Sequence, residues 1–101
     1  MKIAIATIDK KENSKITDKG GRAPYYLVFG ENKELVEEIK NPFAIGGGGA
    51  GIAVAKMLAD KGIDVIIAGS FGPNMKEALK DRNLKFEEKK GNAKEIVEEM
   101  V

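Results

Sequence analysis

Two short glycine-rich segments of this chain could bind a ligand through their backbone N–H groups. Residues 45–51 read Ile-Gly-Gly-Gly-Gly-Ala-Gly, and residues 69–73 read Gly-Ser-Phe-Gly-Pro. Glycine lets a ligand approach peptide N–H groups closely, although it loses more conformational entropy on folding than other residues. Where such a loop opens a helix, the free N–H groups and the positive end of the helix dipole form an anion site. A flexible loop without a ligand is the alternative interpretation of residues 45–51.

Side chains near the two segments suggest how an anion would be held. Ser70 and Asn74 offer a hydroxyl and an amide, and Arg22, which follows a pair of glycines, offers a forked cation. The alternative roles are local caps for the first two and a solvated loop charge for Arg22. Tyr25 and Tyr26 are adjacent, so they point to opposite faces of a strand; at most one lines the site, and we expect the other to pack.

The residue types that are missing exclude most familiar active sites. The chain has no Cys or His, which rules out disulfides, Cys/His zinc sites, thiol nucleophiles and Ser-His-Asp triads. Carboxylates, Lys, Tyr, Ser, Thr and backbone groups remain as the chemically useful groups.

Charge and composition narrow the class of protein further. Lys and Arg total 17 against 16 Asp and Glu, for a formal charge of +1, which argues against a dedicated nucleic-acid or membrane-surface binder. No apolar run approaches the length of a membrane span, and we expect a single cytoplasmic domain over residues 1–101. The absence of Trp and Gln beside abundant Lys and Glu is similar to the composition of heat-adapted proteins.

Two common phosphate-binding motifs do not fit the first glycine segment. Residues 46–51 formally match the Gly-x-Gly-x-x-Gly pattern of dinucleotide sites, but the preceding residues 40–45 are short and broken by proline. Asp64, the candidate ribose ligand, stands at the start of the next predicted strand instead of its end. The nucleotide-hydrolase loop requires Gly-Lys-Ser/Thr at its end, and that sequence is absent here.

Hydrophobic periodicity predicts the elements that position these segments. Alternating or continuous apolar runs predict strands, and apolar stripes predict helices. The predicted helix boundaries include Pro73 as a first helical residue, Asn83 as a left-handed stop and Asn92 as an N-cap. The predicted strands cover residues 2–7, 25–29, 63–68 and 84–87, and the predicted helices cover residues 52–61, 73–82 and 92–100. Residues 9–21 read as a long loop with a brief strand near Ile16. The alternation indicates an α/β layer fold with some parallel pairing.

Residues 33–40 fit two interpretations. Leu35, Val36 and Ile39 form a helical stripe, whereas residues 30–33 suit a hairpin turn into another strand. Propensity alone favours a helix, and Asn41-Pro42 ends either element.

The order and spacing of these motifs resemble the dinitrogenase iron-molybdenum cofactor biosynthesis family, the nitrogenase accessory factors of the NifX and NifB C-terminal type. The matching pieces cover nearly the whole chain and lie in residues 1–7, 21–26, 49–52 and 62–73. The resemblance implies a three-layer α/β/α fold with a ribonuclease-H-like motif. It implies a mixed five-stranded sheet in which three meandering strands precede a helix-strand-helix-strand-helix run. It therefore implies that residues 35–40 form a strand beside residues 25–29.

The resemblance implies a binding or carrier protein, not an enzyme, for an anionic iron-sulfur or iron-molybdenum cofactor precursor. Without Cys or His, such a ligand would be held by cations and helix N-termini. Its partners would be metallocluster donor or acceptor proteins. The expected ligand-binding residues are Lys19, Gly21, Arg22, Gly48, Gly49, Gly51, Gly69, Ser70, Gly72 and Asn74.

Two alternatives accompany this expectation. One is a protein-interaction or regulatory module that keeps the fold without the ligand. The other is a metal-dependent nuclease or phosphotransferase, which needs carboxylates that converge on a metal pair. Asp9, Asp60 and Asp64 are the available carboxylates on the relevant elements, and their predicted positions do not converge.

Overall fold

A computed structural model describes residues 1–45 and 49–100. The strands are β1 (Ile3–Thr7), β2 (Tyr25–Phe29), β3 (Leu35–Lys40), β4 (Val65–Ala68) and β5 (Lys85–Glu88), and the helices are α1 (Ala50–Asp60), α2 (Pro73–Asp81) and α3 (Ala93–Glu99). The strands form one sheet in the order β3-β2-β1-β4-β5.

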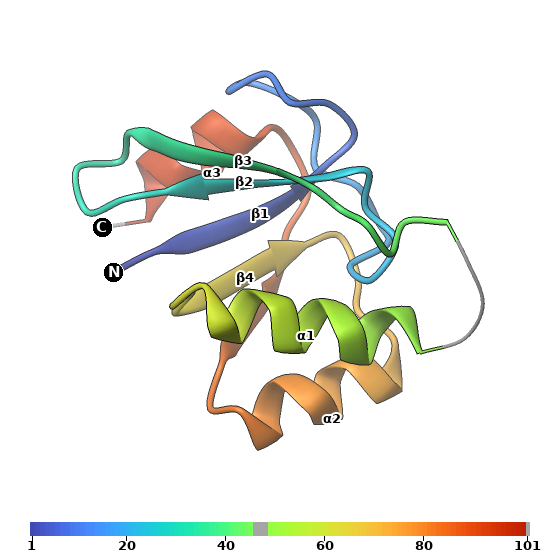
Figure 1. Cartoon of the computed structure of the whole chain (residues 1–101). Helices are drawn as coiled ribbons and strands as arrows, with labels where there is room; N and C mark the ends of the chain where they lie inside the picture. The colour runs from blue at the N-terminus through green and yellow to red at the C-terminus, as the bar shows by residue number, and fades with distance from the viewer. Residues whose placement is uncertain (46–48, 101) are drawn as a thin grey trace.

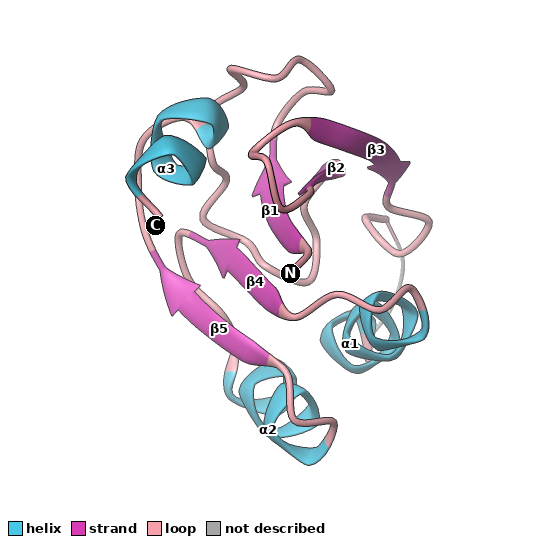
Figure 2. Cartoon of the chain, turned by 90° about the vertical axis from the view of Figure 1, so that its left-hand side faces the viewer, coloured by secondary structure: helices cyan, strands magenta, loops and turns pink. Residues whose placement is uncertain are grey.

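The sheet is mixed, as the family resemblance implied. β1 pairs antiparallel with β2, and β2 pairs antiparallel with β3, which makes the meander. β4 pairs parallel with β1 and with β5. Figure 2 shows α1 and α2 on one face of the sheet and α3 on the other. The predicted three-layer α/β/α fold is confirmed.

Each face of the sheet has its own apolar core, because side chains alternate between faces along a strand. Tyr26 and Val28 pack on the α1 and α2 side, in a cluster that includes Leu58 and Leu79. Their neighbours on β2, including Leu27, pack on the α3 side instead. Of the two adjacent tyrosines, Tyr26 is thus the one that packs, as expected.

β3 corrects the helical interpretation of residues 33–40. Ile39 pairs with Tyr26 across the β2–β3 ladder and is buried beneath α1 and α2, while a register shift occurs between Val28 and Phe29. A helical stripe would require all three apolar residues on one side, but Leu35 packs on the α3 side. The strand that the resemblance implied is confirmed, and pairing with β2 overrides helix propensity.

The predicted helix start and stop residues are confirmed. Pro73 opens α2, Asn83 has a φ of 58°, and the Asn92 side chain accepts a hydrogen bond from the Glu95 N–H at 3.0 Å. The brief strand expected near Ile16 is an isolated bridge to Thr7. The start of α1 differs from the prediction, because the helix begins at Ala50 and not at residue 52.

The long loop after β1 and the short loop after β4 meet at the carboxyl ends of these two strands. Residues 8–24 follow β1, residues 69–72 follow β4, and they are joined by a hydrogen bond from the Gly69 N–H to the Thr17 carbonyl at 2.8 Å. Figure 1 shows the start of α1 and the start of α2 at this same end of the sheet. Ligands of open α/β sheets bind at such an edge, so the fold directs attention there. Among the described residues, no helix is long and apolar enough to span a membrane.

Candidate functional site

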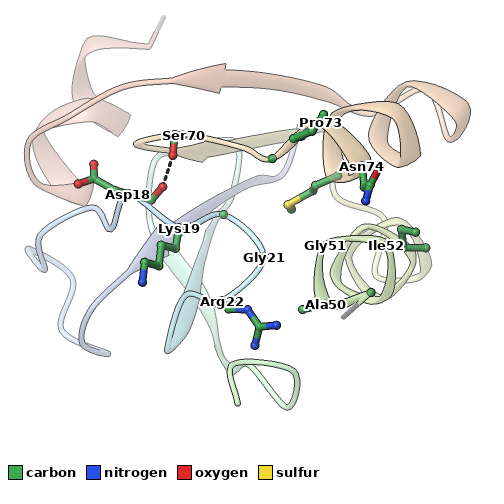
Figure 3. Close-up of a pocket in the computed structure, with 14 residues that line it drawn as sticks. Asp18, Lys19, Gly21, Arg22, Ala50, Gly51, Ile52, Ser70, Pro73 and Asn74 are labelled. Carbon is green, nitrogen blue, oxygen red and sulfur yellow. Dashed lines mark hydrogen bonds between the residues drawn. The ribbon is translucent and has the colours of Figure 1, made fainter. Parts of the chain in front are cut away.

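A pocket of about 340 Å³ lies where these loops meet the two helices (Figure 3). Small-molecule sites begin at about 300 Å³, so the volume suits a compact ligand. Three segments far apart in sequence form its walls: the loop after β1, the start of α1, and the β4–α2 loop with the start of α2. The lining residues are Asp18, Lys19, Gly20, Gly21, Arg22, Gly49, Ala50, Gly51, Ile52, Ser70, Gly72, Pro73, Asn74 and Met75. We call this the anion pocket.

Two helix N-termini open into the anion pocket. The hydrogen-bond ladder of α1 begins with the Ala53 N–H donating to Gly49 at 3.0 Å, and that of α2 begins with Lys76 donating to Gly72 at 3.0 Å. The N–H groups before Ala53 and Lys76 therefore have no intrahelical acceptor. Neither first turn carries an acidic residue, so the positive ends of both helix dipoles are uncompensated within their own helices.

Helix α1 supplies more donors than α2. Its first three residues each carry an N–H, whereas the first residue of α2 is Pro73, which has none. The α2 terminus therefore contributes the N–H groups of Asn74 and Met75. The Glu88 carboxylate accepts from the Phe71 N–H at 3.1 Å just before α2, so α1 is the helix whose N-terminus is better suited to an anion.

Close packing, not ligand approach alone, requires two of the glycines. A Cβ on Gly51 would lie 2.7 Å from the Cβ of Met75, at the contact between α1 and α2. A Cβ on Gly21 would lie 3.0 Å from the Cα of Gly51. Gly49 differs, because it caps α1 at a φ of 86° in open space, a conformation that L side chains rarely adopt. The glycine segment is thus explained in part by helix packing.

The loop after β1 is fixed against the β4–α2 loop. The Ser70 hydroxyl donates to the Asp18 carbonyl, and the Gly20 N–H donates to the Ser70 carbonyl at 3.0 Å. A Cβ on Gly69 would lie 2.8 Å from the Cα of Asp18. Ser70 therefore has a structural hydrogen bond in addition to its place in the pocket wall, and Gly69 lies beneath the loop.

The charged side chains around the anion pocket differ in direction. Lys19, Arg22 and Asp18 are all exposed. In Figure 3 the Arg22 guanidinium extends toward Ala50 at the start of α1, whereas the Lys19 ammonium and the Asp18 carboxylate extend away from the two helices. Arg22 is consequently the cation best placed to act together with the helix N-termini.

The structure brings most of the predicted ligand-binding residues together. Eight line the pocket: Lys19, Gly21, Arg22, Gly49, Gly51, Ser70, Gly72 and Asn74. Gly69 does not line it, and Gly48 lies outside the described residues. Whether any of them binds a ligand stays a prediction.

The sequence prediction missed six lining residues. Asp18 and Gly20 lie in the loop after β1, and Ala50, Ile52, Pro73 and Met75 stand in the first turns of α1 and α2. Pro73 was identified as a helix start, and that signal could have placed its neighbours in the pocket. Ala50 was missed because α1 was predicted to begin two residues too late.

The side chains of the pocket are poorly suited to ligating a metal directly. In the described part of the chain, no group of three or more His, Cys, Asp or Glu residues could hold a metal ion. Tyr26 does not line the pocket, and burial raises the pKa of its hydroxyl far above the ordinary value. The pocket can therefore hold an anion through N–H groups and a guanidinium, without inner-sphere ligands from Cys or His.

Solved structures share this fold closely. The apo orange protein from Desulfovibrio gigas is 24% identical, with a TM-score of 0.89 over 96% of this chain and 83% of that chain. A NifB-like protein from Thermotoga is 28% identical, with a TM-score of 0.79 over 96% and 84% of the two chains. A dinitrogenase-like protein from Methanocaldococcus jannaschii is 14% identical, with a TM-score of 0.62 over 98% and 89%. The first and third likenesses concern the fold alone.

The sequence comparison is consistent with the structural one. No curated protein matches the chain. The family described as "Dinitrogenase iron-molybdenum cofactor" matches residues 1–101, and its match spans both glycine segments and every segment of the anion pocket. The chain belongs to the dinitrogenase iron-molybdenum cofactor family.

Proposed function

We propose that this protein carries an anionic iron-sulfur or iron-molybdenum cofactor precursor, or a similar anionic ligand, in the anion pocket. The family is one of small accessory proteins of iron-molybdenum cofactor biosynthesis. The observation that carries the proposal is the convergence of two helix N-termini, both without acidic residues in their first turns, on one pocket beside Arg22.

The donor set determines how the ligand would be held. N–H groups and a guanidinium donate hydrogen bonds, so they recognise the sulfide or oxygen surface of a cluster and not its metal ions. The metal ions would keep the ligands with which the cluster arrives. A carrier benefits from this mode, because release to a partner then requires no metal–protein bond to break.

The same reasoning favours binding over catalysis. The proposed contacts supply no nucleophile and no general base. The Ser70 hydroxyl already donates to the main-chain carbonyl of Asp18, and the Asp18 carboxylate extends away from the helices (Figure 3). We propose that the ligand leaves the pocket chemically unchanged, toward proteins that donate or accept metalloclusters.

Anaerobic titration with isolated iron-molybdenum cofactor tests the proposal. We expect cofactor absorbance to co-elute with the protein in gel filtration and the melting temperature to rise, because a ligand that binds only the folded state stabilises it. Molybdate and phosphate serve as small-anion comparisons. Absence of both co-elution and a melting shift would exclude the carrier function and leave the interaction module as the better interpretation.

A further inference from the structure

Asn41 joins two loops beside the anion pocket although it does not line the pocket itself. Its exposed fraction is 4%. The side-chain Nδ2 donates to the carbonyls of Gly21 at 3.2 Å and Ala23 at 2.9 Å, and Oδ1 accepts from the Phe43 N–H at 2.9 Å. The Asn41 N–H donates to the Pro24 carbonyl at 3.0 Å. The buried amide thus uses both its donor and its acceptor capacity within the protein.

The two carbonyls that Asn41 holds belong to the residues on either side of Arg22. One amide group therefore holds the Gly21–Arg22 peptide and the Ala23–Pro24 peptide, which lie on either side of the Arg22–Ala23 peptide. On its other side, Gly21 packs closely against α1, since a Cβ there would lie 3.0 Å from the Cα of Gly51. Asn41 therefore hydrogen-bonds to both neighbours of Arg22, and one of them, Gly21, lies against the first turn of α1.

We propose that Asn41 is a positioning residue of the anion pocket, which holds Arg22 in place to act with the α1 N-terminus. The inference rests on the proposed function for its ligand, whereas the clamp itself consists of hydrogen bonds within the protein. A merely structural Asn41 would stabilise the fold without a specific link to Arg22. The two roles differ in how the Asn41 and Arg22 substitutions combine.

A double-mutant cycle separates these roles. The affinity for isolated iron-molybdenum cofactor is measured for the wild type, Asn41→Ala, Arg22→Ala and the double variant. We expect Asn41→Ala alone to weaken binding by about fivefold to tenfold, and by less than about twofold when Arg22 is already replaced, because residues of one network are not additive. Equal losses in both backgrounds would overturn the positioning role.

Ser14→Ala is the matched control. Ser14 is also a buried polar loop residue, 6% exposed, and its Oγ accepts from the Asp9 N–H at 3.0 Å. It does not line the anion pocket. We expect this variant to lose stability and keep its cofactor affinity. An affinity loss equal to that of Asn41→Ala would contradict the inference.

Hydrogen exchange tests the clamp even if the wild type binds no cofactor, an outcome that would refute the proposed function alone. We expect Asn41→Ala to accelerate hydrogen exchange at the Arg22 and Phe43 amides. Exchange at the Ala93 amide, which donates to the Ser14 main-chain carbonyl at 2.8 Å, should stay unchanged. Asn41→Ser, which keeps a donor, replaces this variant if it does not fold. Uniform acceleration throughout the chain would overturn the local role of Asn41.

Discussion

Replacement of Arg22 by alanine should weaken binding of the iron-molybdenum cofactor more than any other single loss of charge at the anion pocket. Arg22 lines the pocket, and its guanidinium extends toward Ala50, so we expect it to add a charge-assisted hydrogen bond to a bound anion beside the donors of α1. Hydrogen bonds to charged groups contribute about 1.5–3 kcal/mol. Because Arg22 is exposed, solvent and salt reduce this contribution, and we expect about 1–2 kcal/mol.

That free energy corresponds to a dissociation constant about 5-fold to 30-fold higher. Anaerobic calorimetric titration at low and at physiological salt measures it, and the difference between wild type and variant should shrink as salt is added. Arg22→Lys should recover only part of the affinity, because an ammonium keeps the charge and loses the planar fork.

Lys19→Ala is the control for charge alone. It removes the same charge from the same loop, but the Lys19 ammonium extends away from both helices in Figure 3. We expect its dissociation constant to change by only about twofold, as for an exposed surface charge. Unchanged affinity in Arg22→Ala, or an equal loss in both variants, would refute the assignment of Arg22 to the site.

The remaining predictions concern three residues of the scaffold. Gly51→Ala places a Cβ 2.7 Å from that of Met75, so denaturant unfolding should show a loss of about 1–3 kcal/mol; unchanged stability would show that α1 and α2 separate easily. Asn92→Ala removes the acceptor for the Glu95 N–H at 3.0 Å and should cost about 1 kcal/mol in the same assay, whereas no loss would deny the cap. The buried Tyr26 hydroxyl has no hydrogen-bond partner among residues 1–45 and 49–100, so Tyr26→Phe should preserve or raise the melting temperature. Folding raises the pKa of Tyr26, so the tyrosine of the unfolded chain ionises at a lower pH than that of the folded chain. The free energy of unfolding of the wild type should therefore fall above about pH 10, by up to about 1.4 kcal/mol per pH unit. An equal fall in Tyr26→Phe would contradict this prediction.

Local signals were sufficient for most element boundaries. Pro73, Asn83 and Asn92 act through their own backbone conformation or a hydrogen bond three residues away, and such effects are visible in a short window of sequence. The buried run of β4 was equally clear, because parallel strands covered on both faces are continuously apolar.

The strand β3 could not be predicted from its own residues. Its pattern suits a helix, and it becomes a strand because Ile39 pairs with Tyr26 across the sheet. A register shift between Val28 and Phe29 disturbs the alternation that would have signalled a strand. The family resemblance supplied this information, since it carries the tertiary context that propensity lacks.

The candidate site was also predicted only in part from the sequence. The glycine segments predicted a backbone-lined pocket, and the residues of its three walls do lie together. The reason for Gly51 was hidden, because the contact with Met75 joins residues that are distant in sequence. Asn41 was interpreted only as part of a helix or strand terminator, since its hydrogen bonds to Gly21 and Ala23 appear only in the folded chain.

Site-resolved NMR during cofactor titration tests the central claim most directly. The paramagnetic iron-molybdenum cofactor broadens signals of nearby amides, and we predict broadening first at Gly21, Gly51 and Asn74 in the anion pocket. The amides of Ile3 and Val65, which line a separate cavity at the opposite ends of β1 and β4, should stay sharp. Broadening centred on Ile3 and Val65, or no selective broadening at saturating cofactor, would contradict the assignment of the anion pocket as the carrier site.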